Sequence, residues 1–257
     1  MRLTWIVQAN MRDRRLLAQV EAALDRRGED VLRVELVPFS REVPVLPFAA
    51  EQRKVICFGA SFVPRVAIET TWRPGIYFAP ETFRWSVMAE HWRGLMFTPD
   101  GVVTTACEAL GELDASGPRF VRPDADSKLF DGGCYADASE LRTALGSADR
   151  SVAVVMGRAR AVDAEWRTFI VDGQIVEASE YRRAGSPSLH RGAPPRVLDL
   201  VDEALARWSP AVATCIDVAS SGEHFGIVEA NCINAARLYA ADADVVVSAI
   251  SEHARSA

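Results

Sequence analysis

Two β-rich runs near the C-terminus, residues 212–219 and 227–231, indicate a hairpin with a loop between them. Asp217 and Glu229 are symmetric about the centre of that loop, so they are expected to lie opposite each other, with Asn231 on the face of Glu229. Facing like charges destabilise a strand pair unless something neutralises them. Two carboxylates and a carboxamide oxygen form an all-oxygen site that suits Mg²⁺.

The alternative for this hairpin is a solvated face that carries two exposed acids. The neighbouring apolar residues favour the metal site, because they indicate that the other face of the hairpin is buried. These residues are Ile216, Val218, Val228 and Ala230.

An arginine occupies an unusual position in a second predicted hairpin, residues 165–171 and 174–179. Asp172-Gly173 between two β-rich runs is the signature of a two-residue type I′ turn. Arg167 lies on an otherwise apolar face, which is expected of an arginine that faces a ligand. The alternative is an edge-strand arginine paired with a nearby acid. The turn would place Val171 opposite Gln174 and Glu165 opposite Glu180.

Two cations six positions apart, Arg122 and Lys128, precede the glycine pair at residues 132–133. This arrangement suits a flap that closes over phosphate oxygens, because arginine binds them as a fork and lysine as a point charge. The alternative is a solvated lysine with a surface arginine paired to Asp124 or Asp126. Only two of the 29 basic residues are lysines, which favours a functional role for Lys128.

Together these three sets resemble the ATP-grasp superfamily, in particular its R2K clade, over about residues 118–245. Residues 120–128 are similar to its phosphate-binding strand and flap. Residues 165–182 resemble the strand pair whose arginine faces the triphosphate, and residues 216–239 resemble the terminal metal-binding hairpin. Most ATP-grasp enzymes carry lysine at the position of Arg122, and this difference is what the clade name describes.

The resemblance implies ATP and Mg²⁺ as cofactors. It implies metal ligands at Asp217, Glu229 and Asn231, and catalytic phosphate ligands at Arg122, Lys128 and Arg167. The implied contacts with the nucleotide are Arg122, Lys128, Val155, Met156, Glu165, Arg167, Asp217 and Glu229, with the backbone of Val155 and Met156 against adenine.

The implied reaction is ATP-dependent ligation. A carboxylate of a small molecule or peptide would attack the γ-phosphate, and an amine or similar nucleophile would then displace phosphate from the acylphosphate. The alternative is a non-catalytic ATP-binding module that acts through a protein partner. We expect the substrate between the N-terminal unit and the hairpins, with contacts at Gly59, Ser61, Arg182 or Arg183, and expect His190 to be a loop residue.

The elements that must position these residues begin with a parallel α/β unit. A strand at 3–9, a helix at 12–27 and strands at 31–37 and 54–61 support it, and the aromatic-rich residues 62–98 would cover it. No GxGxxG or GxxxxGK[ST] motif is present. A helix at 104–113 follows, and then short antiparallel strands.

The expected fold class is therefore α/β and α+β, an ATP-grasp fold with an N-terminal parallel α/β (pre-ATP-grasp) domain. The expected domains are residues 1–98 and an ATP-grasp domain at 99–257, whose two α+β subdomains divide near residue 155.

The composition indicates a globular chain, with 257 residues, 49% hydrophobic and 25% charged. The net charge of −6, with acids and arginines interspersed, argues against nucleic acid as the main partner. No apolar run approaches the ~18 residues of a membrane span. We expect a cytoplasmic protein with buried, reduced cysteines, and consider a homodimer as its assembly.

Overall fold

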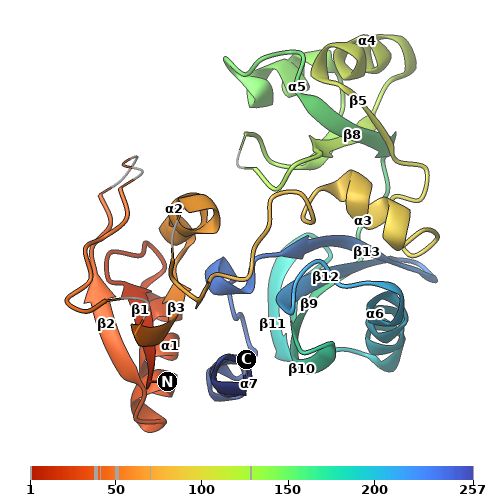
Figure 1. Ribbon diagram of the computed structural model, residues 1–257. Helices are drawn as coiled ribbons and strands as arrows, with labels where there is room; N and C mark the ends of the chain where they lie inside the picture. Colours follow the sequence, from red (N-terminus) through yellow and green to blue (C-terminus); the bar gives the residue numbers. More distant parts are fainter. Residues whose placement is uncertain are drawn as a thin grey trace.

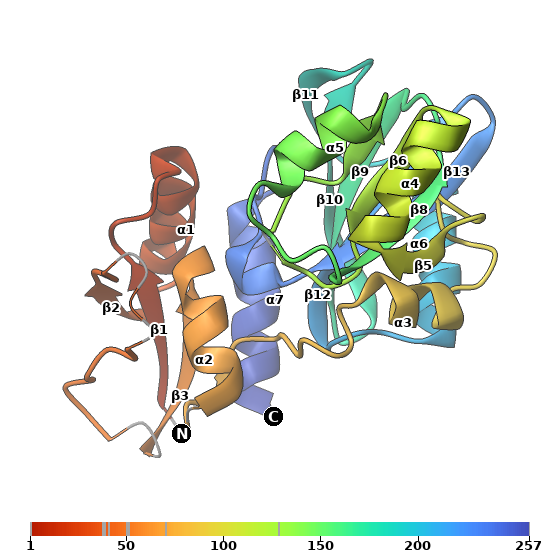
Figure 2. The same ribbon diagram turned by 90° about the horizontal axis from the view of Figure 1, so that it is seen from above.

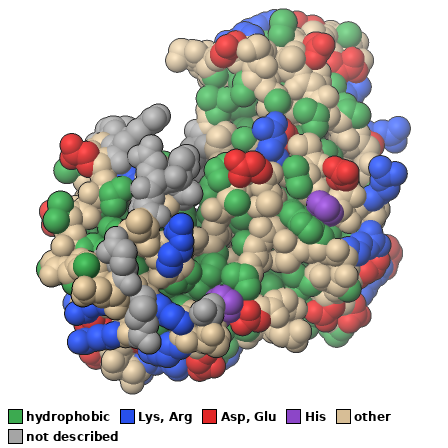
Figure 3. Space-filling model, viewed as in Figure 1, with side chains coloured by type: hydrophobic (Ala, Val, Ile, Leu, Met, Phe, Trp, Pro, Cys, Tyr) green, Lys and Arg blue, Asp and Glu red, His purple; other side chains and the backbone are tan. Residues whose placement is uncertain are grey.

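The computed structural model describes residues 2–37, 40, 42–49, 52–69, 71–127 and 129–256, with only the backbone for residues 67–69. These residues form three sheets of different strand order, each packed against helices (Figure 1). On the face shown in Figure 3, acidic and basic side chains are interspersed. No helix among the described residues is long and apolar enough to cross a membrane.

The N-terminal sheet has the order β2-β1-β3-β4, and all its neighbouring strands are parallel, as predicted. Asp13 caps the first helix by accepting a hydrogen bond from the Leu16 N–H, and Gly28 follows it with a φ of 62°. The strand predicted to reach residue 61 ends at Phe58 and continues as a 3₁₀ turn. The elements are β1 (Arg2–Gln8), α1 (Arg14–Arg26), β2 (Asp30–Val34), β3 (Arg53–Phe58), η2 (Ala60–Phe62), α2 (Val63–Glu69) and β4 (Pro74–Gly75).

The aromatic segment does not cover this unit throughout. Trp72 packs against the N-terminal sheet, but Phe83, Trp85 and Trp92 pack against the C-terminal sheet. Helix α3 (Trp85–His91) belongs to this second part, and the following residues 95–97 form backbone hydrogen bonds with Ile227. The predicted cover is therefore wrong beyond about residue 78, because the chain has already crossed to another sheet.

The middle sheet is antiparallel, with the order β5-β8-β6-β7. Helices α4 and α5 lie side by side over it (Figure 2). Thr105 and Glu108 form a capping box, so α4 begins at Ala106, and the first residues of the predicted helix belong to a strand. The elements are β5 (Val102–Thr105), α4 (Ala106–Ser116), β6 (Arg119–Pro123), β7 (Gly133–Tyr135), α5 (Ala138–Leu145) and β8 (Ala153–Arg158).

The C-terminal sheet is also antiparallel, with the order β11-β10-β9-β12-β13. Helix α6 covers one face (Figure 1), while α7 lies between this sheet and the N-terminal sheet. The elements are β9 (Ala164–Val171), β10 (Gln174–Arg183), β11 (Ser186–Arg191), α6 (Pro195–Arg207), β12 (Ala213–Ser221), β13 (His224–Asn231), η3 (Ile233–Ala235) and α7 (Ala243–Ser256).

Residue 155, where we expected the subdomains to divide, lies inside β8. The chain leaves the middle sheet after Arg158 and enters the C-terminal sheet at Ala164. Helix α7 packs against α1, β1 and β3, although it was expected to belong to the second domain. The domain bounds themselves stay a prediction.

All five cysteines are free. Cys57, Cys215 and Cys232 are buried as expected, but Cys107 and Cys134 are exposed, which corrects the prediction for these two. Burial raises the pKa of Cys232 to about 12, so this thiol is not a reactive thiolate near neutral pH.

Candidate active site

The β12–β13 hairpin places Asp217 directly opposite Glu229, as predicted. The predicted loop is wrong, because β12 runs to Ser221 and β13 starts at His224, which leaves a two-residue turn. A β-bulge after Asp217 shifts the register by one residue and restores the predicted pair.

Arg167 lies on β9, between β10 and β12, directly beside Asp217. Its Nε is 2.8 Å from Oδ1 of Asp217 and its Nη2 is 2.7 Å from Oδ2, a bidentate pair. The Arg167 side chain is 10% exposed and that of Asp217 is 3% exposed. The alternative is therefore wrong about the edge position, because β9 is a central strand, but the pairing with a nearby acid that it predicted is present.

Arg122 projects from β6 of the middle sheet and reaches the C-terminal sheet. Its Nη2 is 2.9 Å from Oε2 of Glu229, and its Nη1 donates to the Val228 carbonyl at 3.2 Å. Asp124, one of the partners proposed for a surface arginine, instead accepts hydrogen bonds from Arg84 and Ser86. Arg122 thus connects the two sheets through the carboxylate of a predicted metal ligand.

Asn231 joins the two carboxylates. Its Nδ2 donates to Oδ2 of Asp217 at 3.2 Å and to Oε1 of Glu229 at 3.0 Å. Asn231 therefore lies within hydrogen-bonding distance of both other predicted metal ligands. No group of three or more His, Cys, Asp or Glu side chains in the described part of the chain could hold a metal, so the predicted ligand set consists of two carboxylates and the Asn231 carboxamide.

Burial and the two arginines shift the pKa values of the carboxylates in opposite directions. Burial raises the pKa of Asp217, although Arg167 opposes this effect. Burial also acts to raise the pKa of Glu229, but Arg122 and Asn231 outweigh it and lower the pKa below its ordinary value. Burial would lower the pKa of Arg167, yet Asp217 outweighs it and raises the pKa well above its ordinary value.

These groups line one cavity of about 590 Å³ between the middle and C-terminal sheets. Its size is within the range of cofactor sites. Its lining combines charged groups with apolar side chains, as is typical of a site for a ligand with an apolar ring and a charged chain. The charged and amide groups include Arg122, Glu165, Arg167, Asp217, Glu229 and Asn231, and the apolar side chains include Trp85, Phe97, Phe120, Val162 and Val228.

Comparison with known proteins identifies the family. Residues 69–250 match the model described as ATP-grasp domain, R2K clade family 3. The chain belongs to this family. No curated protein matches the sequence.

Solved structures share the ATP-grasp fold at low sequence identity. A RimK domain ATP-grasp protein from Sphaerobacter thermophilus has a TM-score of 0.64 at 12% identity, over 96% of this chain and 99% of that chain. D-alanine–D-alanine ligase from Bacillus anthracis has a TM-score of 0.59 at 14% identity, over 100% and 98%. The ATP-grasp ligase PsnB, complexed with a precursor variant, Mg and ADP, has a TM-score of 0.58 at 13% identity, over 98% and 99%. The predicted fold class is confirmed.

In this ATP-grasp protein, the two residues predicted to contact adenine do not line the cavity. Val155 is fully buried in β8 and pairs with Val103 and Arg122, and neither Val155 nor Met156 lines the cavity. Residues of the connection between the two sheets line it instead. These are Arg158, Arg160 and Val162. The sequence pattern did not show where β8 ends and where the connection to the C-terminal sheet begins.

Lys128 lies outside the described residues, and its neighbour Ser127 lines the cavity. Glu165 lies in the cavity as predicted, where its Oε1 accepts a hydrogen bond from the Tyr181 hydroxyl at 3.1 Å and its Oε2 lies 2.9 Å from Nη1 of Arg182. Five of the six described residues with predicted charged or metal roles thus lie on two hairpins of the C-terminal sheet, and Arg122 lies on β6 of the middle sheet.

Two tyrosines were missed as site residues. The rings of Tyr181 and Tyr239 stack at 4.7 Å with a 13° interplanar angle, and the Arg167 guanidinium lies 5.9 and 5.3 Å from them. Tyr239 has a φ of 55°, which is uncommon for a residue other than glycine. Tyr181 belongs to the second hairpin motif, but nothing in the sequence indicated the positive φ of Tyr239.

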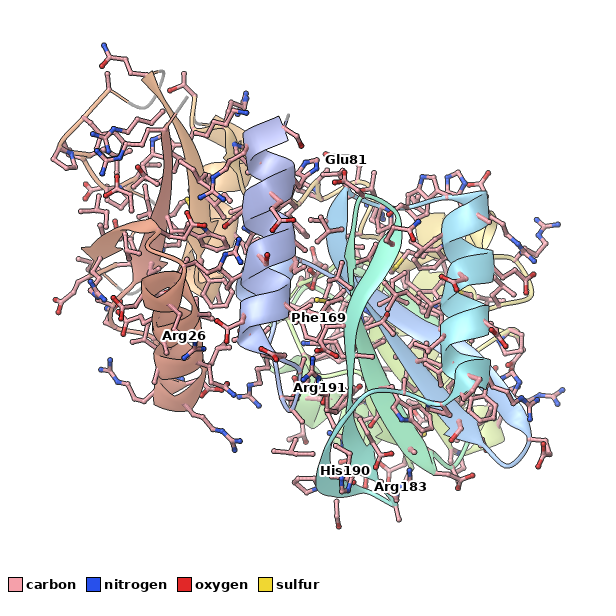
Figure 4. The ribbon with its side chains drawn as sticks, turned by 90° about the horizontal axis from the view of Figure 1, so that it is seen from below. Arg26, Glu81, Phe169, Arg183, His190 and Arg191 are labelled. Carbon is pink, nitrogen blue, oxygen red and sulfur yellow. The ribbon has the colours of Figure 1, made fainter. Side chains whose placement is uncertain are left out.

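The proposed substrate contacts are only partly brought together. Arg182 lines the cavity, but Gly59, Ser61 and Arg183 do not. Arg183 pairs with Glu180, and Figure 4 shows it with His190 near one end of the β10–β11 hairpin. His190 is an exposed residue of β11, so its prediction as a loop residue is wrong, and it does not line the cavity.

Proposed function

We propose that this protein is a Mg-ATP-dependent ligase that joins a carboxylate to an amine or similar nucleophile through an acylphosphate. The observation that carries the proposal is the convergence of two arginine–carboxylate pairs and Asn231 in one cavity between two sheets. Members of the same fold are ligases by name, including PsnB and D-alanine–D-alanine ligase. The proposed substrate class covers both small molecules and peptides, since PsnB has been solved with a precursor peptide.

The donor set fits a magnesium ion. Asp217, Glu229 and Asn231 would hold it, and all three can offer oxygen atoms, which Mg²⁺ prefers. When bound, the ion would stabilise charge that develops on the transferred phosphoryl group. The two carboxylates already face each other, so the hairpin needs no change of register to present them.

The arginines supply the phosphate contacts in this proposal. Each guanidinium has five N–H donors in a planar fork, and some of them are directed to a carboxylate. Turning towards phosphate oxygens would let Arg122 and Arg167 offset the charge on the transferred group. Because Arg122 comes from the middle sheet and Arg167 from the C-terminal sheet, the two would hold the phosphates between the sheets. Lys128 is proposed as a third cation of this set.

The proposed reaction has two steps, each balanced in atoms and charge. A substrate carboxylate oxygen attacks the γ-phosphorus of ATP, which releases ADP and forms an acylphosphate. An amine then attacks the acyl carbon, phosphate leaves, and the amine loses a proton as the amide forms. The apolar lining of the cavity would exclude water and so protect the acylphosphate from hydrolysis.

The test is release of ADP in the presence of ATP, Mg²⁺ and a panel of carboxylates and amines, with hydroxylamine as a general nucleophile. We expect acid-dependent ADP release and formation of a hydroxamate, which reports the acylphosphate directly. ATP binding without ADP release from any acid would reject the ligase and support the ATP-binding module. Arg196→Gln is a suitable control variant, because Arg196 is half exposed and pairs with Glu223 outside the cavity.

A further inference from the structure

A second cavity of about 310 Å³ adjoins the first one. It lies between the start of α1, the β10–β11 hairpin and the segment that precedes α7. Both cavities share Tyr181, Arg182 and Tyr239. Its lining residues from α1 are Asp13, Arg15, Leu16 and Gln19, and those opposite include Pro187, Leu189, Arg237 and Leu238.

The charge of this second cavity is opposite to that of the chain. Three arginines and one acid line it, so its lining has a net charge of +2 in a protein whose net charge is −6. Asp13 is already engaged, because it accepts the capping hydrogen bond of Leu16 at 3.0 Å and lies 3.5 Å from Nε of Arg237. Arg182 also lies 2.9 Å from Oε2 of Glu165, so the cations with the least acidic competition are Arg15 and Arg237, whose contact with Asp13 is long.

The cationic groups are accessible. The Arg237 side chain is 67% exposed and that of Arg182 is 53% exposed. No ion pair in the described part of the chain involves Arg15, whereas many of the other arginines are paired with acids. Exposed guanidinium groups are well suited to bind carboxylates as forks.

The tyrosine pair forms the wall between the two cavities. Tyr181 and Tyr239 stack on each other, and both rings lie near Arg167, which belongs to the first cavity. A molecule that spans this wall would have one end beside Arg167 and the other beside Arg15 and Arg237. The side chains of Leu16, Leu189 and Leu238 offer apolar contacts for a short hydrocarbon spacer.

We propose that the second cavity binds the carboxylate substrate and that this substrate carries a second anionic group, held by Arg15 and Arg237. The class is a short dicarboxylate such as glutarate, either free or as the C-terminal glutamate of a peptide, whose α- and γ-carboxylates supply the two anionic groups. One carboxylate is directed past Tyr239 to the phosphate site, and the arginines select the other. This assignment rests on the ligase function proposed above.

The test compares glutarate with its uncharged-end analogue, glutaric acid monoamide, using hydroxylamine as the nucleophile. We expect KM for glutarate to rise by about ten- to a hundredfold in Arg237→Gln and in Arg15→Gln, the range for loss of a charged hydrogen bond. The KM for the monoamide and the KM for ATP stay within about threefold. Arg12→Gln is the matched control, since Arg12 is exposed on the same segment and does not line the cavity.

Equal use of glutarate and the monoamide, or unchanged KM for glutarate in both variants, would overturn the assignment. An N-acetylated Ala-Ala-Glu peptide with a free C-terminus, which carries both carboxylates, is tested in parallel and distinguishes a peptide acid from a free one. Calorimetric titration of glutarate into the protein with MgADP measures binding at this site without the ligase reaction. Binding that depends on Arg237 without ADP release from any acid rejects the ligase but supports the site. Turnover of acids with no dependence on Arg15 or Arg237 supports the ligase but rejects the site.

Discussion

Replacing Asp217 with asparagine should destabilise the protein as well as weaken metal binding. The carboxylate is 3% exposed and accepts two hydrogen bonds from Arg167 at 2.7 and 2.8 Å and one from Asn231 at 3.2 Å. An amide would turn an NH₂ group towards one of these donors and leave the buried arginine without its counter-ion. Breaking a buried ion pair in this way costs about 3–5 kcal/mol. We expect the lower end, about 3 kcal/mol, because one oxygen remains as an acceptor.

The measurement is urea unfolding of Asp217→Asn without ligands, supported by the melting temperature. For a chain of this size, about 3 kcal/mol corresponds to a Tm lower by about 6–12 °C. Asp244→Asn is the matched control, since Asp244 forms an equally bidentate pair with Arg26 in solvent, with side chains 42% and 58% exposed. Arg26 lies on α1 (Figure 4) and Asp244 on α7, and loss of this exposed pair should cost no more than about 1 kcal/mol.

A double variant distinguishes the effect of breaking a buried ion pair from a general folding defect. Arg167→Met combined with Asp217→Leu should recover most of the lost stability, because apolar side chains of similar volume replace a buried ion pair at little cost. It should not recover Mg²⁺-dependent ATP binding. A free energy of unfolding for Asp217→Asn within about 1 kcal/mol of the wild type would refute the reasoning, as would a double variant no more stable than the single one.

Three further outcomes follow from individual contacts. Glu229→Gln should abolish ADP release and weaken ATP binding only when Mg²⁺ is present; full activity would reject the metal assignment. Asn234→Ala should lower the free energy of unfolding by about 2–3 kcal/mol, because buried Asn234 donates to the Cys57 carbonyl and accepts from the Tyr77 N–H, both at 2.8 Å; an unchanged urea midpoint would contradict this. Gly226→Ala should destabilise, because its Cβ would lie 2.4 Å from Cα of Phe97, whereas Gly111→Ala in α4 meets nothing within 4 Å and should stabilise by about 0.5–1 kcal/mol in the same assay.

The hairpins show how far local pattern determines register. The type I′ turn at Asp172-Gly173 is confirmed, since both residues have positive φ and Val171 pairs with Gln174. The pairing predicted farther along is wrong, because Glu165 lies opposite Arg182 rather than Glu180. Two bulges in β10 add residues that pattern alone does not reveal. In β12–β13 an error in the loop and an unseen bulge cancel, so Asp217 and Glu229 still face each other.

The site could be predicted where its residues share one hairpin and not where they come from separate elements. Asp217, Glu229 and Asn231 were found because strand periodicity puts them on one face. The ion pair of Arg122 with Glu229 depends on how two sheets approach each other, and no local pattern contains that information. The same holds for Arg160 and Val162, which follow β8, and for Tyr239, which stacks on Tyr181 and has a positive φ.

The charges of the site change the argument for a metal. The sequence suggested a cation because two carboxylates face each other, but Arg122 and Arg167 already balance Asp217 and Glu229, two charges against two. Facing acids alone therefore do not require a metal. In the proposed function, the requirement would arise when phosphates compete for the same arginines, because each guanidinium that turned to a phosphate would leave a carboxylate without its counter-ion. The nucleotide and the cation would then be needed together, and Asn231, which contacts both carboxylates, would be positioned to take part in that exchange.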